Sequence, residues 1–245
     1  MKRGLQWQWL RYGLRLGVLA LLFVAPWFAH QRVVATGGHA VGHETPSPLK
    51  GNVWSAQLAG VSITDPLGGV ESVAASHGAS AATWIGMAIP VVVTVLLGRV
   101  FCSWICPAGL LFELADKLRK PGHGAEPRPL WRGHKYTLLG AGLALSFLVG
   151  LPLLGLFYPP AVLGREASRM TLGFLPEVAA GVSRGSALVL TGGAVFLAGI
   201  VVVELFGWRR AWCAKLCPGG ALYSLLGARR LLRLRNDTAV CTRCR

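Results

Sequence analysis

Four of the six cysteines lie in two matching segments of the chain. The segments run Phe101-Cys102-Ser103-Trp104-Ile105-Cys106-Pro107-Ala108-Gly109 and Trp212-Cys213-Ala214-Lys215-Leu216-Cys217-Pro218-Gly219-Gly220. Both follow the pattern aromatic-Cys-x-x-x-Cys-Pro-x-Gly, and their first cysteines, at 102 and 213, stand 111 residues apart. Two copies of such a specific pattern favour a shared chemical role.

Thiolates are the ligands of iron–sulfur clusters and of many zinc sites, which commonly take four of them. Each segment supplies two, so the pairs together would supply four. Cys-x-x-x-Cys-Pro is also the second half of the bacterial ferredoxin run. In a helix, cysteines four residues apart share one face, and the following Pro suits a helical first turn. We predict that Cys102, Cys106, Cys213 and Cys217 hold or flank an iron–sulfur centre, with buried packing cysteines as the alternative.

The last two cysteines, Cys241 and Cys244, have the spacing that opens a ferredoxin run. A [4Fe–4S] cluster takes four cysteines, so this partial motif is not expected to hold one by itself. Either the printed chain is a truncation or these two thiols have another use.

The elements that must position these cysteines are apolar. The 245 residues are 53% hydrophobic and 14% charged, against about 25% charged in an average protein. Charge is absent from four long windows, and about 20 apolar residues suffice for a helix to cross a membrane. The pattern excludes an ordinary soluble protein and predicts an all-α polytopic membrane protein. The four transmembrane helices are expected at about 14–31, 79–98, 137–157 and 185–205.

The first window also resembles a signal peptide, because it is short and follows basic residues. Trp7, Trp9 and Trp27 stand where interfacial anchors belong, which favours an uncleaved first span.

Basic residues set the predicted orientation. The N-terminal segment carries four Lys and Arg, the loop between spans two and three seven, and the tail from residue 207 nine; the other two connections carry two and three. Loops rich in Lys and Arg stay cytoplasmic, so both termini are expected there, in a bacterial inner membrane. The net charge of +15 therefore suits anionic membrane lipid, and no nucleic acid is expected as a partner.

The cysteine segments belong to a longer repeat. Thr64-Asp65-Pro66-Leu67 before the second span resembles Tyr158-Pro159-Pro160-Ala161 before the fourth. The chain is thus expected to be two parallel two-span repeats, related by an axis along the membrane normal that brings both cysteine pairs to the cytoplasmic surface. We divide it into a four-span membrane domain, 1–206, with the first motif at 102–107 in its cytoplasmic loop, and a cytoplasmic tail, 207–245. The tail contains the second motif at 213–218 and the partial motif at 241–244.

These features resemble the NapH family, the related MauN proteins and, in part, NosR-type regulators. The resemblance rests on Thr64-Asp65-Pro66-Leu67, Phe101-Cys102-Ser103-Trp104, Cys106-Pro107, Glu113-Leu114-Ala115, Gly164-Arg165, Val203-Glu204, Cys217-Pro218 and Gly220-Ala221-Leu222-Tyr223. It implies a membrane quinol dehydrogenase component that passes electrons toward a periplasmic nitrate-reductase system. It also implies [4Fe–4S] clusters, including two in a longer C-terminal tail, a soluble ferredoxin-type protein and a c-type cytochrome as partners.

Two carboxylates need a role. Glu204, at the end of the fourth span, is a candidate proton acceptor for quinol oxidation, because ionisable groups at membrane depth are costly. The alternative is an ion pair with Arg209 or Arg210. Glu113 is expected to form a solvated pair with Lys117, four residues away.

Two other functions compete with the electron relay. The chain could be a membrane anchor or assembly partner that docks a soluble ferredoxin-type protein without redox chemistry of its own. It could also be a thiol–disulfide carrier, which requires its cysteines on the outer, oxidising side of the membrane.

Overall fold

A computed structural model describes residues 2–35, 55–58, 61–78, 81–118, 133–173, 191–206 and 212–231. The helices are α1 (Lys2–Ala35), α2 (Pro66–Ser76), α3 (Ala81–Leu97), α4 (Ala108–Leu118), α5 (His134–Val149), α6 (Leu154–Phe157), α7 (Pro159–Gly173), α9 (Gly192–Phe206) and α10 (Pro218–Leu226). Two π-helical turns, η1 (Phe101–Ile105) and η2 (Trp212–Leu216), and a 3-10 turn, η3 (Gly227–Arg229), complete the helical elements described. Strands β1 (Ser55–Leu58) and β2 (Val61–Thr64) form an antiparallel hairpin.

The mostly helical fold confirms the all-α prediction, with the short hairpin as an unexpected addition. Four-residue strands are too short to show a clear alternation of apolar and polar residues, so the sequence did not indicate them. Strand β2 leads directly into Asp65, whose carboxylate accepts a hydrogen bond from Gly68 N at 3.2 Å and so caps α2. The hairpin and this cap fix where α2 begins.

The predicted spans match helices only in part. Helix α3 closely follows the second window, but α5 ends at Val149, so the third window, 137–157, is not one continuous helix. Gly150 is the reason: it takes a left-handed conformation (φ 71°), and its N–H closes the helix on Ser146 O at 2.9 Å.

Among the described residues, one helical segment, Gln6–Trp27, is long and apolar enough to cross a membrane. Thr83–Leu97 and Gly192–Phe206 are apolar but shorter. Residues 185–190 of the fourth predicted span lie outside the described part. The four-span topology therefore remains a prediction.

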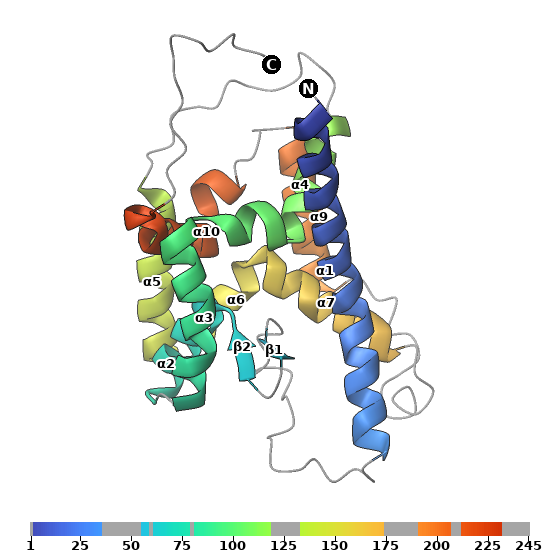
Figure 1. Ribbon diagram of the computed structural model, residues 1–245. Coiled ribbons are helices and arrows are strands. Elements are labelled where there is room, and N and C mark those ends of the chain that lie inside the picture. Colours follow the sequence, from blue (N-terminus) through green and yellow to red (C-terminus); the bar gives the residue numbers. More distant parts are fainter. Residues whose placement is uncertain are drawn as a thin grey trace.

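Helices from the two halves pack crosswise. Helix α2 packs against α5 and α7 against α1, so each inter-span connection covers the first helix of the opposite half. The turn η1 contacts α1 in the same way that η2 contacts α5. Figure 1 shows α4, α6 and α7 crossing the middle of the molecule between the upright α1 and the upright α3 and α5. This exchange of contacts is what two related repeats would produce.

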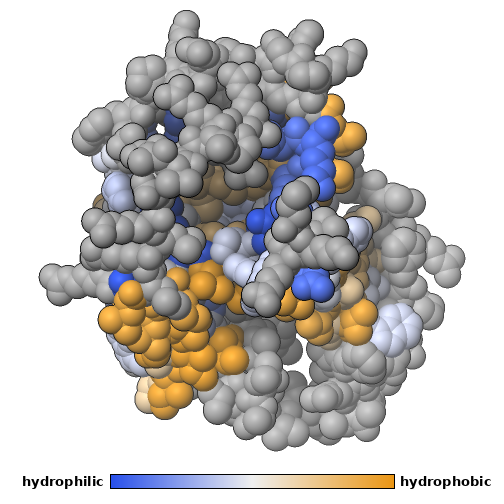
Figure 2. Space-filling view, turned by 45° about the horizontal axis from the view of Figure 1, so that its top comes forward, coloured by the Kyte–Doolittle hydropathy of each residue, from blue (hydrophilic) through white to orange (hydrophobic). Residues whose placement is uncertain are grey.

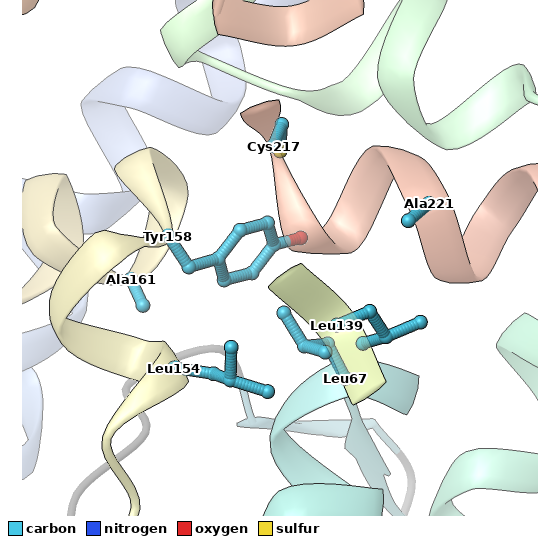
Figure 3. Packing of buried hydrophobic residues seen from close by; sticks show 7 residues of the cluster. All are labelled: Leu67, Leu139, Leu154, Tyr158, Ala161, Cys217 and Ala221. Atoms are coloured by element: carbon cyan, nitrogen blue, oxygen red, sulfur yellow. The ribbon is translucent and has the colours of Figure 1, made fainter. Parts of the chain in front are cut away.

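Two apolar clusters form the core, and each contains the second cysteine of one motif. The larger comprises Leu67, Leu139, Leu154, Tyr158, Ala161, Cys217 and Ala221 (Figure 3). The smaller comprises Cys106, Ala108, Phe112 and Ile200. Trp212 packs against both, so the second motif touches both clusters.

Large apolar side chains also face outward. Examples on α3 and α5 are Trp84, Ile85, Ile89, Val92, Leu145, Phe147 and Leu148. Figure 2 shows one such apolar area at the lower left of its face, with hydrophilic side chains gathered higher up. Extensive exposed apolar surface marks a face that contacts a membrane or another protein.

Candidate functional site

The two cysteine segments fold into the same rare backbone structure. Each forms one π-helical turn, closed by Cys106 N donating to Phe101 O at 2.9 Å and by Cys217 N donating to Trp212 O at 2.8 Å. Such i→i+5 turns are rare and occur frequently at functional sites. The repeat therefore extends from the residue pattern to the backbone.

This geometry corrects the expected α-helical spacing of the cysteines. The second cysteine of each pair leaves the helix in an extended conformation, with ψ of 114° at Cys106 and 117° at Cys217. Helix α10 begins at Pro218, directly after Cys217, whereas α4 begins at Ala108, with Pro107 in a turn before it, so the two prolines take the two roles that suit this residue, a helical first turn and a bend. Each pair thus straddles the junction between a π-helical turn and a new helix.

Backbone N–H groups at these junctions point toward sulfur. Gly220 N donates to Cys217 Sγ at 3.4 Å. A Cβ on Gly220 would lie 3.1 Å from the Cys213 carbonyl oxygen, so a larger residue would crowd the turn at this position. Hydrogen bonds to sulfur are among the features that tune iron–sulfur centres.

Burial is the main influence on the pKa values of all four described cysteines. Burial raises the pKa of the Cys106 thiol to about 11 and that of Cys217 to about 12. Burial, followed by the charges of Cys106 and Cys217, raises the pKa of Cys102. Part of Cys213 reaches the surface, yet desolvation and then the charges of the other three cysteines raise its pKa as well. Trp212 packs against both the cluster that contains Cys106 and the one that contains Cys217, so the two pairs are neighbours in the fold.

The donor set fits an iron–sulfur group in type and number, because it comprises four free cysteines. Within the described ranges, no three His, Cys, Asp or Glu side chains are close enough together to hold a metal ion. The fold therefore places the two cysteine pairs near each other, but their sulfur atoms are too far apart to bind a single metal ion together. Cys241 and Cys244 lie outside the described residues.

A buried carboxylate beside this site was not anticipated. Asp65 Oδ1 accepts hydrogen bonds from Tyr223 OH at 2.6 Å and from Tyr158 OH at 3.4 Å. Figure 3 shows Tyr158 extending from the start of α7 toward α10, where Cys217 begins the helix. Burial raises the pKa of Asp65, and hydrogen bonds from Tyr223 and Gly68 N oppose that shift. We refer to Asp65, Tyr158 and Tyr223 as the buried triad.

The hydrogen bonds of the buried triad join segments that the sequence places on opposite sides of the membrane. The sequence places Asp65 in an outer connection and Tyr223 in the cytoplasmic tail, but the two are hydrogen-bonded. Phe101 of the first motif stacks on Tyr223, with ring centroids 4.9 Å apart and planes 20° apart. The only signal in the sequence was the resemblance of the Asp65-Pro66 and Tyr158-Pro159 loops.

Both acidic candidates have roles that the structure defines. Glu204 is buried, and its Oε1 accepts a hydrogen bond from Trp212 N at 3.0 Å, which ties the end of α9 to the start of η2. Arg209 and Arg210, its expected partners, lie outside the described residues. The expected pair of Glu113 with Lys117 is wrong, because Glu113 binds Arg11 at 2.5 Å and Arg15 at 2.6 Å on α1.

Comparison with known proteins agrees with this architecture. A family model described as a 4Fe-4S binding domain matches residues 80–124 and 189–235, and each segment contains one cysteine motif. Over 245 residues the chain is 31% identical to the ferredoxin-type protein NapH of Escherichia coli, and the alignment covers 99% of this chain and 73% of that protein. Over 199 residues it is 35% identical to NapH of Haemophilus influenzae, covering 80% and 63%.

The chain belongs to the NapH family of ferredoxin-type proteins. It is also 27% identical over 199 residues to the methylamine utilization ferredoxin-type protein MauN of Methylorubrum extorquens, covering 80% and 63%. The chain spans about two thirds of the length of these relatives. No solved structure matches it. The matched domain supports an iron–sulfur cluster as cofactor and electron transfer as the class of function.

In this NapH-family chain, Glu204 is expected to stabilise the second motif. A Glu204→Ala variant should lose about 1–2 kcal/mol of unfolding free energy, because Trp212 N–H would be left without its acceptor. Glu204→Gln keeps an acceptor oxygen and should lose less. Thermal unfolding of the purified variants measures the difference, and equal losses for Ala and Gln would contradict this role.

Proposed function

We propose that this NapH-family chain carries electrons from membrane quinol toward a periplasmic reductase system of the nitrate-reductase type. Cys102, Cys106, Cys213 and Cys217 would hold the iron–sulfur centre through which the electrons pass. The observation that carries the proposal is the pair of matching π-helical turns, together with the packing of Trp212 against the clusters that contain Cys106 and Cys217. A bound cluster supplies one-electron transfer, and the chain supplies its ligands and surroundings.

Quinol oxidation defines what the protein must provide. Each quinol that becomes quinone releases two electrons and two protons, so the protons need an acceptor near the site. Glu204 lies buried in the last turn of α9 and binds the backbone N–H of Trp212, the residue before Cys213. We assign it the acceptance of these protons as a second task. The Glu204→Gln variant separates the two tasks. It should remain nearly as stable as wild type, but quinol should reduce its iron–sulfur centre more slowly.

The proposed setting is the bacterial inner membrane. The apolar helix Gln6–Trp27 and the outward apolar faces of α3 and α5 support four spans within residues 1–206, with 207–245 as a cytoplasmic tail. Because Tyr223 of that tail binds Asp65, the connection around Asp65 would reach into the membrane domain from the outer side. Both termini would lie in the cytoplasm, and the partners would be a soluble ferredoxin-type protein and a c-type cytochrome. A reporter that is active only outside the cytoplasm should be inactive when inserted between residues 119 and 132 and active when inserted between 36 and 50. The opposite pattern would refute this orientation.

The deciding experiment is iron and acid-labile sulfide analysis, with EPR, of the 245-residue chain purified without oxygen. The relay requires bound iron and an EPR signal that quinol or dithionite can generate. A folded chain without iron would refute it. That result would favour the second candidate, a non-redox anchor for a soluble ferredoxin-type protein, which the lack of converged ligands among the described residues supports.

The thiol–disulfide carrier has less support. A carrier needs an accessible thiolate, which requires a thiol of ordinary or lowered pKa. Burial raises the pKa of both Cys106 and Cys217, and all four described cysteines are free.

A further inference from the structure

The first helix of each half carries the same sequence pattern. Residues 11–24 read RYGLRLGVLALLFV, and residues 135–148 read KYTLLGAGLALSFL. Tyr12 and Tyr136 align, 124 residues apart, and so do the following Leu-Ala-Leu and Phe. At this alignment, Arg15 of α1 corresponds to Leu139 of α5.

The aligned tyrosines make the same contact in both halves. Tyr12 OH donates to Glu113 Oε1 at 2.7 Å, and Tyr136 OH lies 2.9 Å from Ser224 Oγ. Glu113 and Ser224 are also equivalent, because each stands 11 residues after the first cysteine of its motif, at 102 and 213. The first half therefore has Arg15 and Glu113 where the second half has Leu139 and Ser224.

The charged pair reaches directly into the first cysteine motif. Arg15 is 5% exposed, and its Nη1 binds Glu113 Oε2 at 2.6 Å. Its Nη2 donates to the carbonyl oxygen of Ser103, between Cys102 and Cys106, at 2.5 Å. Leu139, equally buried, lies in the apolar cluster around Cys217. Each equivalent residue thus faces the cysteine pair of its own half.

Packing alone does not explain a buried arginine here. Taking an ion pair out of water costs several kcal/mol per ion, and apolar residues of similar volume are often as stable. In the second half, the uncharged Leu139 and Ser224 take the equivalent positions, and Leu139 is equally buried. Arg15 Nε is also buried without a hydrogen-bond partner in the described part of the chain. The packing of this fold therefore does not require charge at these two positions.

We propose that Arg15 is a positioning residue of the first cysteine pair, whose buried guanidinium holds the turn Phe101–Ile105 and stabilises the negative charge of an iron–sulfur centre bound there. This inference rests on the proposed function. A centre that takes up one electron gains one negative charge, so a fixed positive charge beside it favours the reduced state and raises its reduction potential. Arg15 contacts the Ser103 carbonyl between the two cysteines, whereas Glu113 contacts Arg11, Tyr12 and Arg15, so the guanidinium is the charge of this pair that lies against the motif.

The test transplants the uncharged pair of the second half into the first. The Arg15→Leu/Glu113→Ser double variant removes both charges and leaves neither buried alone, so the chain is expected to fold. Iron content and an EPR-monitored redox titration of the complete chain compare it with wild type. Arg11→Gln, at a side chain that is 30% exposed, is the matched control, because solvent screens that charge.

We expect the double variant to keep its iron and its iron–sulfur centre to have a lower reduction potential than that of wild type. The reduction potential of Arg11→Gln should be close to that of wild type. An unchanged potential in the double variant would overturn the proposal. If the double variant folds but loses iron, the Arg15→Lys variant decides, because it keeps the positive charge. Bound iron in Arg15→Lys would support a role for that charge, and no bound iron would refute it.

A wild-type chain without iron would refute the proposed function, yet leave the hold of Arg15 on the turn Phe101–Ile105 testable. Protection of the amides of this turn from hydrogen exchange should then fall in the double variant, but not in the turn Trp212–Leu216, because the Ser103 carbonyl loses its bond to Arg15. Equal protection with and without Arg15 would overturn the proposal.

Discussion

The Cys102→Ser and Cys213→Ser variants of the anaerobically purified chain are each expected to lose most of the iron and acid-labile sulfide bound by wild type. Serine offers a hard hydroxyl oxygen in place of a thiolate, and iron–sulfur clusters are held by thiolates. The first variant removes a proposed ligand from the first half and the second removes one from the second half. Parallel losses of iron would therefore show that both pairs serve a common centre. Iron analysis and EPR measure the loss, and circular dichroism confirms that the variants remain folded.

The tail cysteines provide the matched control for this experiment. A Cys241→Ser/Cys244→Ser variant has the same chemical change at two thiols that cannot complete a four-cysteine ferredoxin motif by themselves. It should keep the iron of wild type. Iron that survives in Cys102→Ser and Cys213→Ser but disappears in the tail variant would place the centre in the tail and contradict the proposed ligands.

The largest expected effect on stability comes from the buried triad. Asp65→Ala should lower the free energy of unfolding by about 3–5 kcal/mol, since it leaves two buried tyrosine hydroxyls without an acceptor and removes the cap of α2. Denaturant or thermal unfolding in detergent, followed by circular dichroism, measures the loss. The variant should also weaken the stacking of Phe101 on Tyr223, because Tyr223 loses the bond that orients it.

Two further variants divide this effect into parts. Asp65→Asn keeps an oxygen acceptor in place and should lose much less stability than the Ala variant. Tyr223→Phe keeps the stacked ring and removes one hydroxyl, for a loss of about 1–2 kcal/mol. Ser72→Ala, at an exposed position of the same helix, serves as the control. Should Asp65→Ala match Ser72→Ala, the triad would contribute nothing to the fold.

The family and the two repeated cysteine turns were predictable because their signals are local. Two copies of Cys-x-x-x-Cys-Pro can be recognised from residue types and spacing, and the start of α10 at Pro218 follows from the missing N–H of proline. The apolar window 79–98 likewise predicted α3, which spans Ala81–Leu97, because composition alone indicates an apolar helix. None of these required knowledge of which distant residues meet.

The tertiary structure decided the contacts between distant residues. The Tyr223–Asp65 bond joins positions 158 residues apart, and the Arg15–Glu113 pair joins positions 98 apart. The expected Glu113–Lys117 pair was wrong because a nearby buried arginine is a stronger partner than an exposed lysine on the same helix. The sequence by itself determined the mostly helical class and the apolar helix α3, which depend on local composition, and the family, which depends on the cysteine motifs. Packing of the two halves decided which charges and hydroxyls surround the cysteines, because burial leaves each polar group to find its partner across the fold.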